Sequence, residues 1–168
     1  MSGEPRIPTA AGCQRDSDGR LVGLIFDSTP PLPAPGTNPW LVAVDGSDNA
    51  LRAVGYAARQ AGEMHACSLH LVNVQHWLSK EAAETELARK AWLATARARA
   101  VLDADSQPWR LHVAMGDAAE RIMELAVGLH CNRIVVGSRR LGVAESFLFG
   151  SVANKLMHLS GPPLAVVP

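Results

Sequence analysis

The residues best suited to chemistry lie between Ile134 and Val152, where a short apolar run leads into a glycine-punctuated loop. The β-branched run ends at Gly137, and Gly150 and Ser151 open a segment whose apolar residues recur at helical spacing. The first N–H groups of a helix lack partners within the helix and point towards any anion placed there. This succession of strand, loop and helix start is typical of a phosphate-binding site.

An acid stands at the end of an earlier apolar run. The segment WLVAVD, from Trp40 to Asp45, has the nearly continuous apolar character of a parallel strand buried on both faces. Ligands of such sheets bind beyond the carboxyl ends of the strands, so we expect Asp45 and Gly137 to face one crevice. There Asp45 could accept hydrogen bonds from a ribose hydroxyl or a base amino group, while Gly137 would admit a close backbone approach. The alternative is that Asp45 is a turn residue that only helps to cap the next helix.

Several common nucleotide-binding and catalytic motifs are missing from the sequence. GSRRLG, which begins at Gly137, is followed by Val and Ala where a Walker motif needs Lys and then Ser or Thr, and the turn after Asp45 lacks GxGxxG. The histidines show no metal-ligand spacing, although His76 follows a predicted strand and could overhang the crevice. No GxSxG elbow, HIGH or SGGxDS motif is present. The sequence therefore predicts neither catalytic residues nor a metal site.

The composition favours a single soluble domain. The 168 residues are 48% hydrophobic, and 16 basic side chains balance 16 acidic ones, so no excess of positive charge attracts nucleic acid. The three cysteines lack CxxC spacing, which favours reduced thiols over a disulfide scaffold. The first residues contain no long apolar run of the kind found in signal peptides or membrane spans. We therefore expect a cytoplasmic protein without nucleic-acid or membrane partners.

Residues 1–39 differ in composition from the rest of the chain. Seven of the eleven prolines lie at or before Pro39, which predicts a largely disordered Pro/Gly-rich extension ahead of a folded domain over residues 40–168. The apolar run LVGLIF, from Leu21 to Phe26, interrupts this extension. We interpret the run as a loosely ordered apolar patch; the alternatives are a strand added to a sheet edge and a peptide docked on a partner.

Beyond residue 39, apolar runs alternate with helical patterns. Ser47 or Asp48 can cap the first helix and Gly62 can end it, while Asp117 and Glu120 form most of a capping box for a later one. The order βαβαβαβαβ predicts an α/β fold, a five-stranded parallel sheet with helices on both faces. The predicted strands are Trp40–Asp45, Ser68–Val74, Trp109–Met115, Arg133–Val136 and the terminal LAVVP, and the predicted helices follow Asp45 and Asp117 and span Ser79 to about Leu102 and Val152 to Leu159.

These features together resemble the universal stress protein family from Trp40 to the end of the chain. The resemblance rests on the DGS that begins at Asp45, on Gly116 after the third predicted strand, and on GSRRLGVAESFLFGSV after the fourth. It implies the family's α/β fold, of the adenine nucleotide alpha hydrolase-like kind, with five parallel strands. It also implies binding of ATP, with or without Mg²⁺, and a role in stress response or regulation rather than a dedicated enzymatic activity.

The family motif assigns residues to the nucleotide. ATP-binding members carry Gly, two residues, Gly, nine residues, Gly and then Ser or Thr, and Gly137, Gly150 and Ser151 match this pattern, whereas Arg140 replaces the second glycine. By resemblance, adenine, ribose and phosphates would lie against the ends of the first, second and fourth strands and the start of the last helix. The implied nucleotide-binding residues are Ala43, Val44, Asp45, Val74, Val136, Gly137, Arg139, Arg140, Gly150, Ser151 and Val152.

Arg140 leaves two outcomes open for this site. Its side chain could exclude the nucleotide, or Arg139 and Arg140 together could add charge-assisted contacts to its phosphates. A third interpretation is that the two arginines are a solvated loop pair. The alternatives to an ATP-binding protein are therefore a nucleotide-independent member of the family that acts through protein contacts and an enzyme that cleaves ATP to pyrophosphate or forms adenylates.

The last predicted strand, Leu164 to Val167, ends the chain with an apolar edge. The family resemblance implies that this strand pairs with its counterpart in a homodimer. An apolar edge strand must be covered to avoid open pairing, and an isologous contact covers both copies at once. The alternative is that the strand pairs only within its own sheet.

Overall fold

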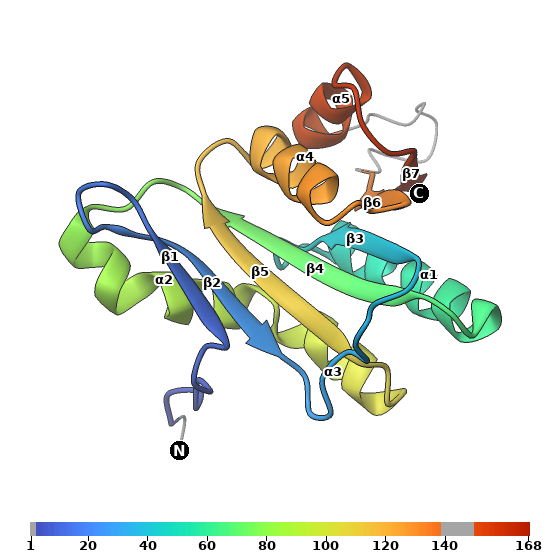
Figure 1. Cartoon of the computed structure of the whole chain (residues 1–168), viewed down its shortest axis with the longest axis horizontal. Helices are drawn as coiled ribbons and strands as arrows, with labels where there is room; N and C mark the ends of the chain where they lie inside the picture. The colour runs from blue at the N-terminus through green and yellow to red at the C-terminus, as the bar shows by residue number, and fades with distance from the viewer. Residues whose placement is uncertain (1–2, 139–149) are drawn as a thin grey trace.

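The computed structural model describes residues 3–138 and 150–168, and a single sheet runs through this part of the chain (Figure 1). The strand order is β1 (Gly12–Arg15), β2 (Leu21–Asp27), β5 (Trp109–Met115), β4 (Ser68–Gln75), β3 (Pro39–Ala43), β6 (Arg133–Gly137) and β7 (Leu164–Val167). The last five strands in this order are mutually parallel, which confirms the predicted α/β fold. The sheet is mixed rather than purely parallel, because β1 and β2 pair antiparallel at its other edge.

Helices cover both faces of the sheet, as predicted. α1 (Asp48–Met64), α2 (Lys80–Ala94) and α3 (Ala96–Ala104) pack on one face, and α4 (Ala118–Gly128) and α5 (Ser151–Met157) pack on the other (Figure 1). Each layer buries its own apolar cluster, with Leu71 and Leu87 in the larger one and Ile122 and Ile134 in the smaller one. No helix in residues 3–138 or 150–168 combines the length and apolar character that a membrane crossing requires.

Local polar contacts set the helix ends. Ser47 caps α1 by accepting a hydrogen bond from the N–H of Ala50 at 3.1 Å, but the helix continues past Gly62 and ends before His65, whose φ is 57°. The predicted long helix from Ser79 is two helices, α2 and α3. The break lies at the buried Thr95, whose hydroxyl donates to the carbonyl of an earlier turn at 2.9 Å, a local bond that favours bending.

The N-terminal extension differs from its prediction. Residues 12–15 and 21–27 form β1 and β2, joined by a turn, so the prediction of a largely disordered extension was wrong for this part. The interpretation of Leu21 to Phe26 as a loosely ordered patch was also wrong, and the edge-strand alternative describes this run. β2 pairs antiparallel with β5 and places Leu24 and Phe26 opposite Val113 and Leu111 on the face covered by α2. The prolines that suggested disorder lie outside β2, which contains none. Burial of its apolar face against α2 stabilises β2.

A close approach of α1 to β6 positions the carboxyl edge of the sheet. A Cβ atom built on Gly137 would overlap the carbonyl group of Asn49, in the first turn of α1, and would lie 3.0 Å from the Asn49 Cβ. The backbone of Gly137 does not have a positive φ, so space rather than conformation requires glycine here. Gly137 was predicted to allow close approach of a ligand, and in the structure it allows close approach of α1.

We expect Phe26→Ala to destabilise the fold by about 3–5 kcal/mol, because Phe26 is 1% exposed and its ring centroid lies 5.3 Å from that of Trp92 on α2. Urea unfolding followed by circular dichroism measures the change. Ile25→Ala is the matched control, because Ile25 points to the opposite, partly open face, and we expect a loss of about 1 kcal/mol. A loss below about 1 kcal/mol for Phe26→Ala would show that β2 lies outside the cooperative fold.

We expect Gly137→Ala to cost about 1–3 kcal/mol of unfolding free energy, because the added methyl group forces α1 away from β6. Gly62→Ala is the matched control. Gly62 lies within α1, and a Cβ there meets nothing within 4 Å, so helix propensity should raise the stability by about 0.5–1 kcal/mol. Equal effects of the two substitutions in thermal and urea unfolding would contradict the packing role of Gly137.

Candidate functional site

A cavity of about 300 Å³ lies at the carboxyl ends of β3, β4 and β6, where α1, α4 and α5 begin. Its surface is mixed apolar and polar, and the polar side chains come from the loops after β3 and β4 and from the first turns of α1 and α5. Its lining residues are Ala43, Val44, Asp45, Ser47, Asn49, Ala50, Val72, Val74, His76, Ala118, Ile122, Val136, Gly137, Gly150, Ser151, Val152 and Ala153.

The turn between β3 and α1 places the carboxylate of Asp45 at the cavity. Asp45 Oδ1 accepts hydrogen bonds from the Ser47 N–H at 3.0 Å and from the Ser47 hydroxyl at 2.6 Å. On the outer side, Arg97 donates to the Gly46 carbonyl at 2.7 Å and to the Asp48 carboxylate at 2.8 Å. Asp45 therefore orders the turn that caps α1, as the turn-residue alternative predicted. It is also exposed at the cavity, as a ligand-binding role requires.

A buried amide aligns the ends of β3 and β4. Asn73 is 1% exposed, and its Nδ2 donates to the Val44 carbonyl at 2.8 Å while its Oδ1 accepts from Gln75 Nε2 at 2.6 Å. Both polar atoms of the Asn73 side chain are thus satisfied within the protein, which makes the pairing rigid. Because side chains alternate along a strand, Val72 and Val74 point to the other face and line the cavity.

An ion pair connects the two helices on the α4 side of the cavity. Asp117, the N-cap of α4, accepts hydrogen bonds from the Glu120 N–H and from Lys155 Nζ on α5, both at 3.0 Å. The backbone N–H of Glu120 is the main cause that lowers the pKa of Asp117, and Lys155 adds to it. The same ion pair raises the pKa of Lys155. Both groups stay charged at neutral pH and hold α5 beside α4.

The end of β6 is tied to α1 and to the end of the chain. The N–H of Ser138 donates to the Val167 carbonyl at 2.8 Å, and Arg52 on α1 donates to the carbonyls of Ser138 at 3.3 Å and Pro168 at 3.2 Å. The Ser138 hydroxyl is buried and has no hydrogen-bond partner among the described residues. These contacts fix the position of the backbone at the end of β6.

The structure brings together nine of the eleven residues predicted for the nucleotide. They are Ala43, Val44, Asp45, Val74, Val136, Gly137, Gly150, Ser151 and Val152, and all nine line the cavity. That they bind a nucleotide stays a prediction. Arg139 and Arg140 lie outside the described residues.

Sequence reasoning missed much of the remaining lining. Ala118 and Ile122 enter the cavity because α4 lies across the ends of the strands, and local sequence carries no signal of that contact. Asn49 was visible only as part of the turn after Asp45. His76 was recognised as a residue that could overhang the crevice, and it does line the cavity. Among the residues that the structure describes, no group of three or more His, Cys, Asp or Glu side chains could hold a metal ion.

The sequence and fold have clear relatives. A sequence model of the Universal stress protein family matches residues 38–168. A universal stress protein from Thermus aquaticus, described as lying in the QAH/OAS sulfhydrylase 3′ region, is 31% identical over 132 residues, which span 76% of this chain and 96% of the relative.

Solved structures share the fold. A universal stress protein from Archaeoglobus fulgidus has a TM-score of 0.64 at 22% identity and covers 77% of this chain and 98% of its own. A universal stress protein in complex with cAMP has a TM-score of 0.59 at 24% identity and covers 79% of this chain and 98% of its own. The family match spans most of the chain, and the structural likeness independently supports the same fold. The chain therefore belongs to the universal stress protein family.

Proposed function

We propose that this protein binds an adenine nucleotide, which in the cell is ATP, in the cavity at the carboxyl ends of β3, β4 and β6. We also propose that it acts in stress response or regulation. The observation that carries the proposal is the convergence of the predicted nucleotide residues on that single cavity. Two structures of this fold support it, one in complex with cAMP and one, from Archaeoglobus fulgidus, in complex with dAMP.

The chemistry of the lining suits a nucleoside. Val72, Val74 and Ile122 offer apolar surface for a base, whereas Asp45 and Ser47 offer oxygens that can accept from hydroxyl or amino groups. A volume of about 300 Å³ is at the lower end for ligand sites, so base and ribose would fill the cavity and phosphates would extend past its mouth.

Phosphates would leave the cavity on the side of Gly150 and Ser151. Asp45 is the one carboxylate in the described lining, so we propose that any Mg²⁺ arrives with the nucleotide and is held chiefly by phosphate oxygens and water. We further propose that the protein is a binder rather than a dedicated enzyme. Assays for AMP, ADP and pyrophosphate after incubation with Mg-ATP test this, and turnover above about 1 s⁻¹ would contradict it.

Calorimetric titration with Mg-ATP and with AMP should show saturable binding with a Kd below about 100 μM. Ala118→Phe should weaken both nucleotides at least tenfold, about 1.4 kcal/mol, because the added ring occupies the cavity. Ala96→Phe is the matched control, since Ala96 is also the first residue of a helix but is exposed and does not line this cavity, and its affinities should stay unchanged.

Two results would contradict the nucleotide proposal. No heat with either nucleotide would favour the alternative, a family member that works through protein contacts without a nucleotide. Binding that is insensitive to Ala118→Phe would place the nucleotide elsewhere. Thermal unfolding of each variant verifies that the fold is retained.

We also propose that the protein forms a homodimer through β7. In the described chain β7 pairs with β6 on one side only, and its four side chains are half-buried. The N–H groups of Ile134 and Ser138 donate to the carbonyls of Pro163 and Val167 at 2.9 Å and 2.8 Å. Alternate residues of a strand point their main-chain groups in opposite directions, so Val166 directs its N–H away from β6.

Val166→Pro should therefore convert the dimer to a folded monomer, because it removes an N–H from the outer edge and spares the bonds to β6. Light scattering after size exclusion should give twice the 17.9 kDa chain mass for the unmodified protein and the single mass for the variant. Circular dichroism checks that the variant remains folded. A monomeric unmodified protein, or a variant that still dimerises, would contradict the role of β7.

A further inference from the structure

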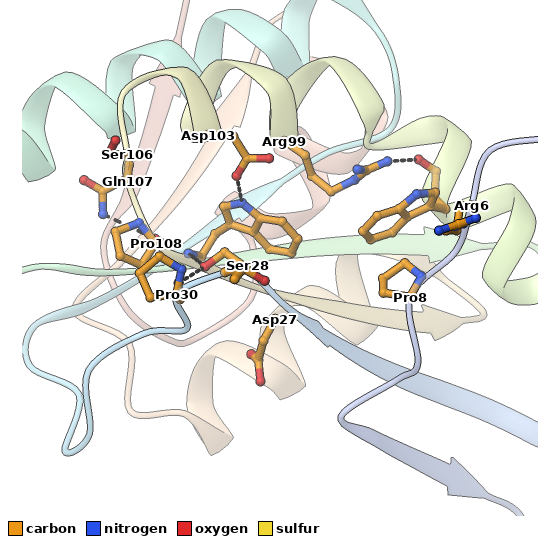
Figure 2. Close-up of a pocket in the computed structure, with 13 residues that line it drawn as sticks. Arg6, Pro8, Asp27, Ser28, Pro30, Arg99, Asp103, Ser106, Gln107 and Pro108 are labelled. Atoms are coloured by element: carbon orange, nitrogen blue, oxygen red, sulfur yellow. Dashed lines mark hydrogen bonds between the residues drawn. The ribbon is translucent and has the colours of Figure 1, made fainter.

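A second cavity, of about 380 Å³, lies at the opposite end of the sheet, beside the first residue of β5 (Figure 2). The labelled residues in Figure 2 reach it from the N-terminal segment, from the end of β2, from α3 and from the turn before β5. Because β5 runs parallel to β3, β4 and β6, this amino end lies far from the carboxyl edge that holds the nucleotide cavity. The two cavities share no lining residue.

One arginine in the wall of this cavity is half-buried and faces neutral partners. Arg99 Nε donates to the Thr95 hydroxyl at 3.1 Å, and Nη2 donates to the Trp92 carbonyl at 2.6 Å. Its guanidinium carbon lies 3.3 Å from the centroid of the Trp92 ring. Within the described residues no carboxylate forms an ion pair with it. Burial lowers the pKa of Arg99 to about 10, although Asp103 acts in the opposite direction, so the group is charged at neutral pH and only partly compensated.

The carboxylates around the cavity already have partners. Asp27 accepts two hydrogen bonds from Arg110, at 2.7 Å and 3.0 Å. Asp103 accepts from the indole N–H of Trp109 at 2.8 Å. Arg6 adds an exposed positive charge from the N-terminal segment. Two arginines and two carboxylates line the cavity, and Arg110, outside the lining, neutralises Asp27. Arg99 and Arg6 therefore exceed Asp103 by one positive charge, which suits a single negative charge on a ligand.

The remaining walls combine flat apolar rings with the polar residues Ser28, Thr29, Ser106 and Gln107. The rings of Trp92 and Trp109 lie 6.3 Å apart at 53°, and the hydrogen bond to Asp103 fixes the indole of Trp109. Three proline rings complete the apolar lining, those of Pro8, Pro30 and Pro108. Indole and pyrrolidine surfaces of this kind pack best against a planar apolar group.

We propose that this second cavity binds a small monoanion with a flat apolar body, an aromatic carboxylate in its simplest form. Its carboxylate meets Arg99, and its ring lies against the half-buried Trp92 and the proline rings, because Trp109 is only 3% exposed. Arg6, Pro8, Asp27, Ser28, Thr29 and Pro30 precede residue 38, where the family match begins. The site therefore belongs to this chain's extension as much as to the shared domain, and it does not depend on nucleotide binding at the other end.

Naphthalene-2-carboxylate and its neutral isostere naphthalene-2-carboxamide are the probes that test the proposal, by calorimetric titration of the full chain. We expect the carboxylate to bind at least about tenfold more tightly than the amide, because only the anion gains charged hydrogen bonds. Arg99→Gln should remove this preference by weakening the carboxylate at least about tenfold and leaving the amide unchanged.

Three further variants locate the site. Arg6→Gln should weaken the carboxylate about threefold, and it keeps the test decisive if Arg99→Gln unfolds, since Arg6 is exposed. Arg59→Gln removes an exposed arginine of α1 that lines neither cavity, and Ala118→Phe fills the nucleotide cavity; both should leave the carboxylate affinity unchanged.

Four results would overturn the proposal. They are the lack of saturable carboxylate binding, equal affinities for carboxylate and amide, an unchanged carboxylate affinity in a folded Arg99→Gln or Arg6→Gln variant, and a loss of carboxylate binding in Ala118→Phe or Arg59→Gln.

Discussion

The contact between Gly137 and the first turn of α1 governs the carboxyl edge of the sheet. Because no side chain fits between them, the backbone of Asn49 rests directly on the end of β6, and α1 can begin only where the β3 turn allows it. Asp45 and Ser47 order that turn, and Arg52, one turn further along α1, reaches the carbonyls where β6 and the chain itself end. The position of one helix start thus sets the shape of the cavity on the α1 side.

Patterns that depend on near neighbours could be predicted from the sequence. The apolar strands and the alternation of strands and helices follow from periods of two and about 3.6 residues. Local capping chemistry predicted Asp117 as one N-cap and limited the other to Ser47 or Asp48, of which Ser47 is the cap. The order in residues 12–27 did not follow, because it depends on contacts far along the chain. The break at Thr95 rests on a local hydroxyl bond, but the continuous helical pattern around it predicts a single helix. Phe26 becomes a core residue only once α2 lies over it.

The candidate site shows the same division. The strand ends could be placed at one crevice because parallel strands share a carboxyl edge, whereas Ala118 and Ile122 enter it only through the packing of α4. Gly137 was assigned correctly to the cavity lining but for a different reason from the one found, since its missing side chain makes room for α1. Arg140 lies outside the described residues, so its effect on phosphates stays a prediction from the family motif.

The extension changes which edges of the sheet can bind another chain. By pairing with β5, β2 moves the free edge to β1, which is four residues long, mostly exposed, and irregular between Gln14 and Arg15. Arg15 is further held by an ion pair with Glu84 on α2. Irregular and charged edges resist main-chain pairing, which favours β7, also four residues long but apolar, as the edge for the proposed dimer. The same extension that pairs with β5 also supplies six of the thirteen lining residues of the second cavity, and pairing through β7 would leave that cavity open to solvent.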